Sequence, residues 1–65
     1  MAPVFEYHEC VGISTASVED AVKQAVTAVA ATRKIAWFEI LSTRGRVTDS
    51  GELEFQVTVK FGCKL

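Results

Sequence analysis

The stretch Glu52–Leu65 has the sequence ELEFQVTVKFGCKL and shows the clearest alternation of apolar and polar residues in the chain. Alternation at every second position is the pattern of a β-strand that buries one of its faces. The apolar face consists of Leu53, Phe55, Val57, Val59, Phe61 and Cys63. The other face carries polar side chains, among them Gln56 and Thr58. This strand is therefore expected to supply the core on one side and a second surface on the other.

Another strand is expected over Ala36–Arg46, joined to Glu52–Leu65 by a turn at Thr48–Gly51, whose sequence TDSG is typical of turns. Strict alternation puts Trp37, Glu39, Leu41 and Thr43 on one face, and Phe38, Ile40, Ser42 and Arg44 on the other. A hairpin around residues 48–51 places Trp37 opposite the end of the last strand and Gln56 beside residues 41–44. Trp37, Gln56 and Arg44 are thus expected on one subunit surface, but not in one tight cluster.

A helix is predicted upstream of this hairpin, from Ser17 to Lys34. Ser17 is a good N-cap, because its hydroxyl can accept from the free amides of the first turn. Glu19 and Asp20 suit the positive end of the helix dipole, and Arg33 and Lys34 suit the negative end. The apolar stripe at helical spacing consists of Val18, Ala21, Val22, Ala25, Ala28, Val29 and Thr32. Its small alanines would let the helix lie close to a sheet.

The first strand is expected over Val4–Ile13, a segment rich in aromatic and β-branched residues. One face holds Phe5, Tyr7, Val11 and Ile13, and the other holds Val4, His8 and Cys10, so alternation leaves open which face meets the core. The element order is β-α-β-β, and a helical crossover favours parallel first and second strands. We expect an α+β fold, residues 1–65 forming one domain. Its three-stranded antiparallel sheet, in the order 1-3-2, partly wraps one helix.

The composition limits the classes of function. The chain has 65 residues, 49% of them hydrophobic, and a formal net charge of −1. This balance argues against disorder and against binding nucleic acid by phosphate neutralisation. No apolar stretch approaches membrane-spanning length, and the start Met1–Pro3 lacks signal-peptide character, so a cytoplasmic protein without a membrane partner is expected. The apolar content exceeds what one thin layer can bury, which makes self-association the expected source of stability.

Three weak signals for sites have simpler interpretations. His8 and Cys10 share a strand face but no acid–base network accompanies them, so both are expected to be ordinary strand residues and Cys63 a second reduced thiol. Asp49 and Glu52 lie in a turn that is more simply a solvated turn than a cation site. The segment Gly12–Ser14 precedes the helix but lacks a phosphate-loop motif. Neither catalytic residues nor a metal are predicted.

Trp37 is a stronger signal, because it is the only tryptophan and opens the segment WFEILSTRGR. An indole usually packs in a core or against another flat group. Considered from the residues alone, it could stack on a ligand or lie in a subunit interface.

The chain resembles the dodecins over nearly its whole length. The matching segments are Glu9–Ser14 at the end of the first strand, Ser17–Lys34 for the single helix, Trp37–Ile40 and Arg44–Gly45 in the second strand, and Phe55–Val57 with Gly62–Leu65 in the third. The combination of WFE, RG seven residues further on, and an FQV strand that ends in a glycine segment is specific to this family. The resemblance implies a hollow homododecamer that binds FMN or riboflavin and, as in some members, coenzyme A.

Carried over residue by residue, the resemblance makes Trp37 the stacking platform for the flavin and Gln56 the hydrogen-bonding partner of the ring edge. It places Arg44 near the ligand or at a subunit contact, and Lys64 where many relatives have an arginine. Lysine keeps the charge but loses the planar, bidentate contacts of arginine. Cys63 stands where many relatives have an aromatic residue, and Ile13 replaces a small hydroxyl residue.

The implied function is storage, buffering and photoprotection of flavin, without enzymatic activity. The alternative is a dodecamer-forming structural or interaction protein that has lost or changed its ligand. A redox enzyme comes third.

Overall fold

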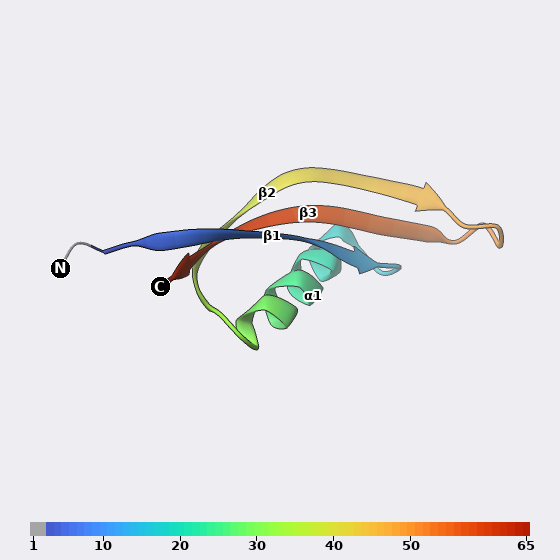
Figure 1. Cartoon of the computed structure of the whole chain (residues 1–65). Coiled ribbons are helices and arrows are strands. Elements are labelled where there is room, and N and C mark those ends of the chain that lie inside the picture. Colours follow the sequence, from blue (N-terminus) through green and yellow to red (C-terminus); the bar gives the residue numbers. More distant parts are fainter. Residues whose placement is uncertain (1–2) are drawn as a thin grey trace.

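The computed structural model describes residues 3–65. Met1 and Ala2, which belong to the segment used above for the expectation about a signal peptide, lie outside the described residues. The elements are β1 (Phe5–Ser14), α1 (Val18–Ala30), β2 (Lys34–Val47) and β3 (Leu53–Lys64). They form one three-stranded sheet in the order β1-β3-β2, with β3 antiparallel to both neighbours. The sheet curves over one helix (Figure 1). The predicted element order, strand order and fold class are confirmed.

The core lies between the helix and the central strand. Val57, Val59, Phe61 and Cys63 of β3 are completely buried. They belong to the apolar face that the alternation of β3 predicted. The helix contributes its own buried residues, Ala21, Ala25 and Val29. Two of these are alanines, whose small side chains allow the backbones of helix and sheet to approach closely.

Gly12 marks the closest approach of β1 to the helix. A Cβ atom at this position would lie 2.0 Å from the carbonyl oxygen of Ala21 and 3.2 Å from the Cβ atom of Ala25. No side chain fits between these two backbones, so the glycine sets the distance between β1 and α1. Gly12 pairs with the buried Val57, which places it on the helix side of the sheet.

The start of the helix is as predicted, but its end is not. The Ser17 hydroxyl accepts a hydrogen bond from the backbone amide of Asp20 at 2.9 Å. The helix ends at Ala30, four residues before the predicted Lys34. The amides of Thr32 and Arg33 both donate to the Val29 carbonyl, which closes a turn, and Lys34 already pairs with β3. Pairing with β3 begins at Lys34, and residues 31–33 form the turn that precedes it.

Arg33 therefore does not serve the helix end as predicted. Its guanidinium pairs with the Glu6 carboxylate of β1 at 2.7 Å. This ion pair is exposed on the surface, so it contributes little to stability. It links the turn after the helix to the first strand.

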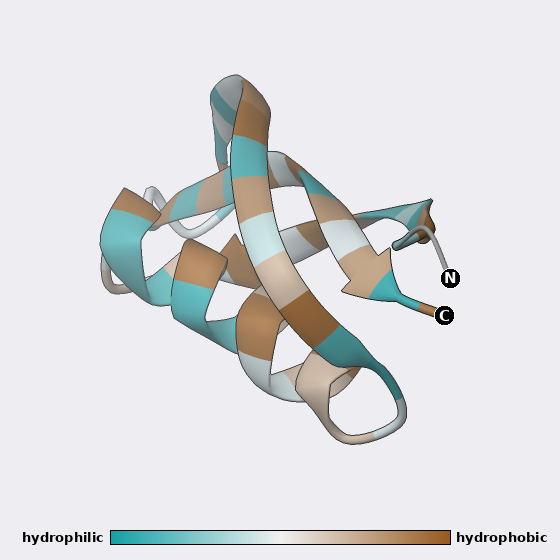
Figure 2. Cartoon of the chain, turned by 90° about the vertical axis from the view of Figure 1, so that its left-hand side faces the viewer, coloured by the Kyte–Doolittle hydropathy of each residue, from teal (hydrophilic) through white to brown (hydrophobic). Residues whose placement is uncertain are grey.

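The structure settles which face of β1 meets the core. His8, Cys10 and Gly12 pair with core residues of β3 and so face the helix. The apolar residues Phe5, Tyr7, Val11 and Ile13 lie on the opposite side of the sheet, which we call the open face. Bands of apolar and polar residues alternate along the strands in Figure 2. The more apolar face of β1 is thus the one that the helix leaves uncovered.

Two bulges shift the register of β2, between Ile35 and Trp37 and between Ile40 and Ser42. Each gives β2 one extra residue, which changes the face of the side chains that follow. After the second bulge, Arg44 pairs with Gln56 on the open face, and Thr43 pairs with the buried Val57 on the helix side. The face assignment by strict alternation is therefore wrong from Ser42 onward. Trp37 and Arg44 share one face.

The hairpin of β2 and β3 extends beyond the end of the helix (Figure 1). Its turn lies where the sequence predicted it: the Gly51 amide donates to the Thr48 carbonyl at 2.9 Å, and Gly51 has a φ of 86°. A positive φ of this kind favours glycine. Val47 and Leu53, at the base of the turn, are 66% and 54% exposed, so they remain uncovered in the single chain.

Substitution of Gly12 tests the close packing of β1 on α1. Gly12→Ala places a methyl group where the Ala21 carbonyl oxygen lies, so helix and strand must separate. We expect a loss of about 1–3 kcal/mol in the free energy of unfolding, measured by guanidinium denaturation followed by circular dichroism. Thr15→Ala, in the exposed connection to the helix, is the control. Equal stability of Gly12→Ala and wild type would contradict this account.

Candidate functional site

Trp37 lies on the open face, at the position of β2 that pairs with Gly62 of β3. Its indole covers this glycine: a Cβ atom built on Gly62 would lie 2.2 Å from the indole Cε2 atom. The side chain is 43% exposed. One side of the indole therefore rests on the backbone of β3, while another part of its surface is open.

Two aromatic rings of β1 flank the indole. The Phe5 ring lies 5.0 Å from it between centroids, at an angle of 59°, and the Tyr7 ring lies 6.4 Å away in an edge-on arrangement at 89°. Both geometries are favourable for aromatic pairs. We call these three residues the aromatic corner. The Lys60 ammonium lies over the Tyr7 ring, 4.3 Å from its centroid, in a cation–π contact.

The hollow at the aromatic corner is small. It has a volume of about 270 Å³ and is lined by Phe5, Glu6, Tyr7 and Trp37. Pockets that enclose organic ligands usually have about 300–1,000 Å³. One chain thus offers a π surface on which a planar group can stack, but not the walls of a closed pocket. A ligand held here needs further contacts from a second molecule.

Gln56 and Arg44 form a second polar group on the open face, where they pair directly across β3 and β2. The Gln56 Nε2 atom donates to the Glu54 carboxylate at 3.2 Å. The same carboxylate accepts from the Arg46 Nε atom at 2.8 Å. These bonds, that from Arg46 most of all, lower the pKa of Glu54.

The four predicted ligand-binding residues fall into two separate pairs. Lys64 is two positions from Gly62 and therefore lies beside Trp37, whereas Arg44 lies beside Gln56. Gln56 and Gly62 are six positions apart on β3, which corresponds to about 20 Å along a strand. This separation agrees with the hairpin register expected from the sequence. One flavin ring cannot reach Trp37 and Gln56 of the same chain.

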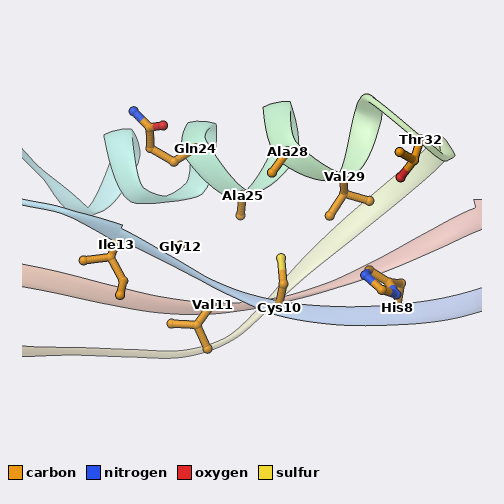
Figure 3. A pocket seen from close by; sticks show the side chains of 10 residues that line it. All are labelled: His8, Cys10, Val11, Gly12, Ile13, Gln24, Ala25, Ala28, Val29 and Thr32. Carbon is orange, nitrogen blue, oxygen red and sulfur yellow. The ribbon is translucent and has the colours of Figure 1, made fainter.

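A different groove, of about 410 Å³, runs between β1 and α1. Figure 3 shows the Cys10 side chain pointing toward the helix, the Val11 side chain pointing away from it, and His8 further along β1. Burial raises the pKa of the Cys10 thiol, which is the opposite of what activates a nucleophile. The groove thus has an unactivated thiol, and its other walls come from β1 and from helix residues such as Ala25, Ala28 and Val29.

Neither a metal centre nor a membrane-spanning helix is found in the part of the chain that the structure describes. Across residues 3–65, no three His, Cys, Asp or Glu side chains come together as a group that could hold a metal ion. The same residues contain no helix long and apolar enough to cross a membrane.

Large apolar side chains are exposed over much of the single chain. They are Val4, Phe5, Tyr7, Val11, Ile13, Trp37, Phe38, Ile40, Leu41, Val47, Leu53 and Leu65. Monomeric soluble proteins rarely expose apolar patches of such extent. This surface favours association with other copies of the chain.

Sequence reasoning did not single out three residues around Trp37: Phe5, Tyr7 and Gly62. Alternation indicates only that Phe5 and Tyr7 share one face of β1, and Gly62 belongs to a glycine motif at the end of β3. Their proximity to Trp37 depends on the pairing of both edge strands with β3. The register of the hairpin could have brought out Gly62, because it places residue 37 opposite the end of β3.

Comparisons with known proteins agree in pointing to one family. The family model described as dodecin matches residues 4–65. Dodecin of Thermus thermophilus is 33% identical over 66 residues, which cover 100% of this chain and 96% of that protein. The structure of dodecin from Streptomyces coelicolor is 38% identical, covers 97% of this chain and 91% of that one, and gives a TM-score of 0.88.

A more distant structure shares the fold alone. The calcium dodecin of Mycobacterium tuberculosis, described with a novel calcium-binding site, is 17% identical and gives a TM-score of 0.79 over 95% of this chain and 90% of that one. With a family model matched over residues 4–65 and a 33% identical relative matched over 96% of its length, the chain belongs to the dodecin family.

Proposed function

We propose that this chain stores and buffers flavin, with the isoalloxazine ring of FMN or riboflavin stacked on Trp37 inside a hollow homododecamer. The observation that carries the proposal is the indole itself, which lies on Gly62 with part of its surface open. An indole offers a π surface to any flat ring. Residues 1–65 act as one dodecin-like domain in this proposal, and cytoplasmic conditions would keep the two free cysteines reduced.

Dodecins are small ligand-binding proteins and not enzymes, and the chain shares this character by its membership of the family. A photoprotective role follows from the stacking. An indole in contact with an excited flavin donates an electron to it and takes the electron back, so the flavin returns to its ground state without reacting further. A flavin held between indoles is also poorly accessible to a second substrate.

The site is proposed to form between subunits. Trp37 and Gln56 of one chain are about 20 Å apart along β3, so a flavin that contacts both kinds of residue takes them from different copies. The apolar side chains of the open face, such as Val11 and Ile13, supply the surface through which copies associate. Assembly and ligand binding would thus use the same face of the sheet.

The other site residues have distinct proposed roles. The Gln56 amide pairs with the edge of the flavin ring, where an amide can both donate and accept. Arg44, beside Gln56, contacts the ligand or the neighbouring subunit. Lys64, beside the aromatic corner, supplies a positive charge to a phosphate group of FMN or of coenzyme A, as a point charge without the bidentate geometry of arginine.

The alternative function is a structural or interaction protein that assembles but has lost or changed its ligand. The extent of the exposed apolar surface favours it, because this surface accounts for assembly without any ligand. The visible absorption spectrum of the protein as purified separates the two functions. A flavin band, followed by identification of the released chromophore, supports storage, and a colourless protein that takes up neither FMN nor riboflavin supports the alternative.

The assembly prediction concerns mass in solution. Light scattering should give about twelve times the 7.1 kDa mass of the chain, because the exposed apolar side chains need partner copies to cover them. The Trp37→Ala variant should keep this mass, since most of the apolar surface remains. A stable, folded monomer at micromolar concentration would be incompatible with the proposal.

The binding prediction concerns Trp37. Trp37→Ala removes the stacking surface and should cost about 1–3 kcal/mol of flavin affinity, by analogy with stacking of bases on aromatic side chains. Titration of FMN and of riboflavin, followed by flavin fluorescence, should show strong quenching by wild type and weak quenching by the variant. Phe38→Ala is the matched control, because Phe38 is the adjacent aromatic residue but faces the helix. Equal quenching by Trp37→Ala and wild type would mean that the flavin does not bind at Trp37.

The prediction for Gln56 separates storage from catalysis. Gln56→Ala leaves polar groups of the bound flavin unpaired, at a cost of about 1–3 kcal/mol for each group. Gln56→Glu should also bind weakly, because a carboxylate accepts hydrogen bonds but cannot donate to a flavin carbonyl. Affinity should fall in both variants while the mass in solution stays unchanged. Enzyme-like turnover of a reduced nicotinamide by wild type, abolished in Gln56→Ala without loss of affinity, would rule out storage.

A further inference from the structure

Gly62 occupies an unexpected position for a glycine. It lies inside β3, the central strand, where it pairs with Tyr7 on one side and with Trp37 on the other. A glycine inside a strand weakens it, because it loses more conformational entropy and has no side chain to pack. The backbone does not require it either: among the glycines of residues 3–65, only Gly51 has a positive φ. The reason for Gly62 must lie in the space above it.

That space is occupied by the indole of Trp37. A Cβ atom on Gly62 would lie 2.2 Å from Cε2, 2.3 Å from Cζ2 and 2.6 Å from Cδ2 of the indole. All three distances are below 3.0 Å, which real Cβ atoms essentially never show. The three atoms belong to the fused ring system and are nearly equidistant from the missing Cβ atom. The indole therefore covers the glycine with its face and fills the volume that a side chain would need.

We propose that Gly62 is a positioning residue for ligand stacking. The inference rests on the proposed function of Trp37. The missing side chain lets the indole lie flat on β3, while the rings of Phe5 and Tyr7 limit its movement toward β1. The free face of the indole then runs parallel to the sheet, in one fixed orientation. Gly62 contacts the indole and not the ligand.

A methyl group at position 62 would force the indole off the strand. The indole cannot move further toward β1, because the Phe5 ring lies 5.0 Å away between centroids and the Tyr7 ring meets it edge-on. It must rise, rotate or move away from β1, and its free face loses the orientation that a stacked ligand requires. Loss of orientation lowers affinity even though the indole is still present.

The first test follows the indole without ligand, and it is specific because Trp37 is the only tryptophan. Gly62→Ala should shift the tryptophan emission to longer wavelength and raise its quenching by acrylamide. Gly45→Ala is the matched control: it makes the same chemical change in β2, where the nearest atom to the new Cβ is the Glu54 carbonyl oxygen at 3.1 Å. Emission and quenching in Gly62→Ala that equal those of wild type would overturn the proposal.

The second test measures FMN affinity by quenching of flavin fluorescence. Gly62→Ala should lose about tenfold or more in affinity, the scale of one lost stacking interaction, and Gly45→Ala should bind like wild type. In a Trp37→Ala background, Gly62→Ala should have no further effect, because the indole through which it acts is gone. A displaced indole with unchanged FMN affinity would overturn the positioning role.

The third test uses stability and remains informative if Gly62→Ala folds poorly. Gly62→Ala should lower the melting temperature of wild type but leave that of Trp37→Ala unchanged or raise it, since alanine is a better strand residue than glycine. Equal destabilisation in both backgrounds would overturn the proposal. If Trp37→Ala itself leaves FMN affinity unchanged, the proposed function fails, whereas the fluorescence and stability tests still report whether Gly62 holds the indole.

Discussion

The helix of this chain has 13 residues, whereas the strands have 10, 14 and 12. One such helix can cover only part of one face of the sheet, and the rest of the structure depends on this shortage. Under the helix, four side chains of β3 are completely buried against Ala21, Ala25 and Val29. Beyond it, the hairpin end and the whole open face remain without cover. Both the proposed association of copies and the proposed ligand site use surface that the helix does not reach.

Much of the fold could be predicted because its strongest signals are local. The alternation of apolar and polar residues in β3 indicates that the segment is a strand and which of its faces is buried. Ser17 marks the start of the helix. The end of the helix could not be predicted from the apolar stripe, because Lys34 and the following residues pair with β3 instead. The face of β1 was also undecided. Both outcomes depend on tertiary pairing, which local preferences do not contain.

The candidate site also has residues that the sequence indicates and residues that depend on tertiary pairing. Trp37 stands out by rarity, and the resemblance to dodecins adds Gln56, Arg44 and Lys64. The sequence alone did not single out the glycine beneath the indole or the two rings beside it, because they come from other strands and meet Trp37 only through the register. A residue that acts by lacking a side chain carries no chemical signal of its own. Only the space around it shows why it is there.

The bulge at Leu41 constrains the number of residues that can lie between Trp37 and Arg44. In a regular strand, two residues on one face are separated by an even number of positions. Trp37 and Arg44 are seven positions apart and share a face, so an odd number of bulges must lie between them. A relative with one residue fewer in this interval can keep both residues on the same face by having a regular strand. In any relative that keeps both residues on one face, the parity of this spacing thus tells whether the number of bulges between them is odd or even.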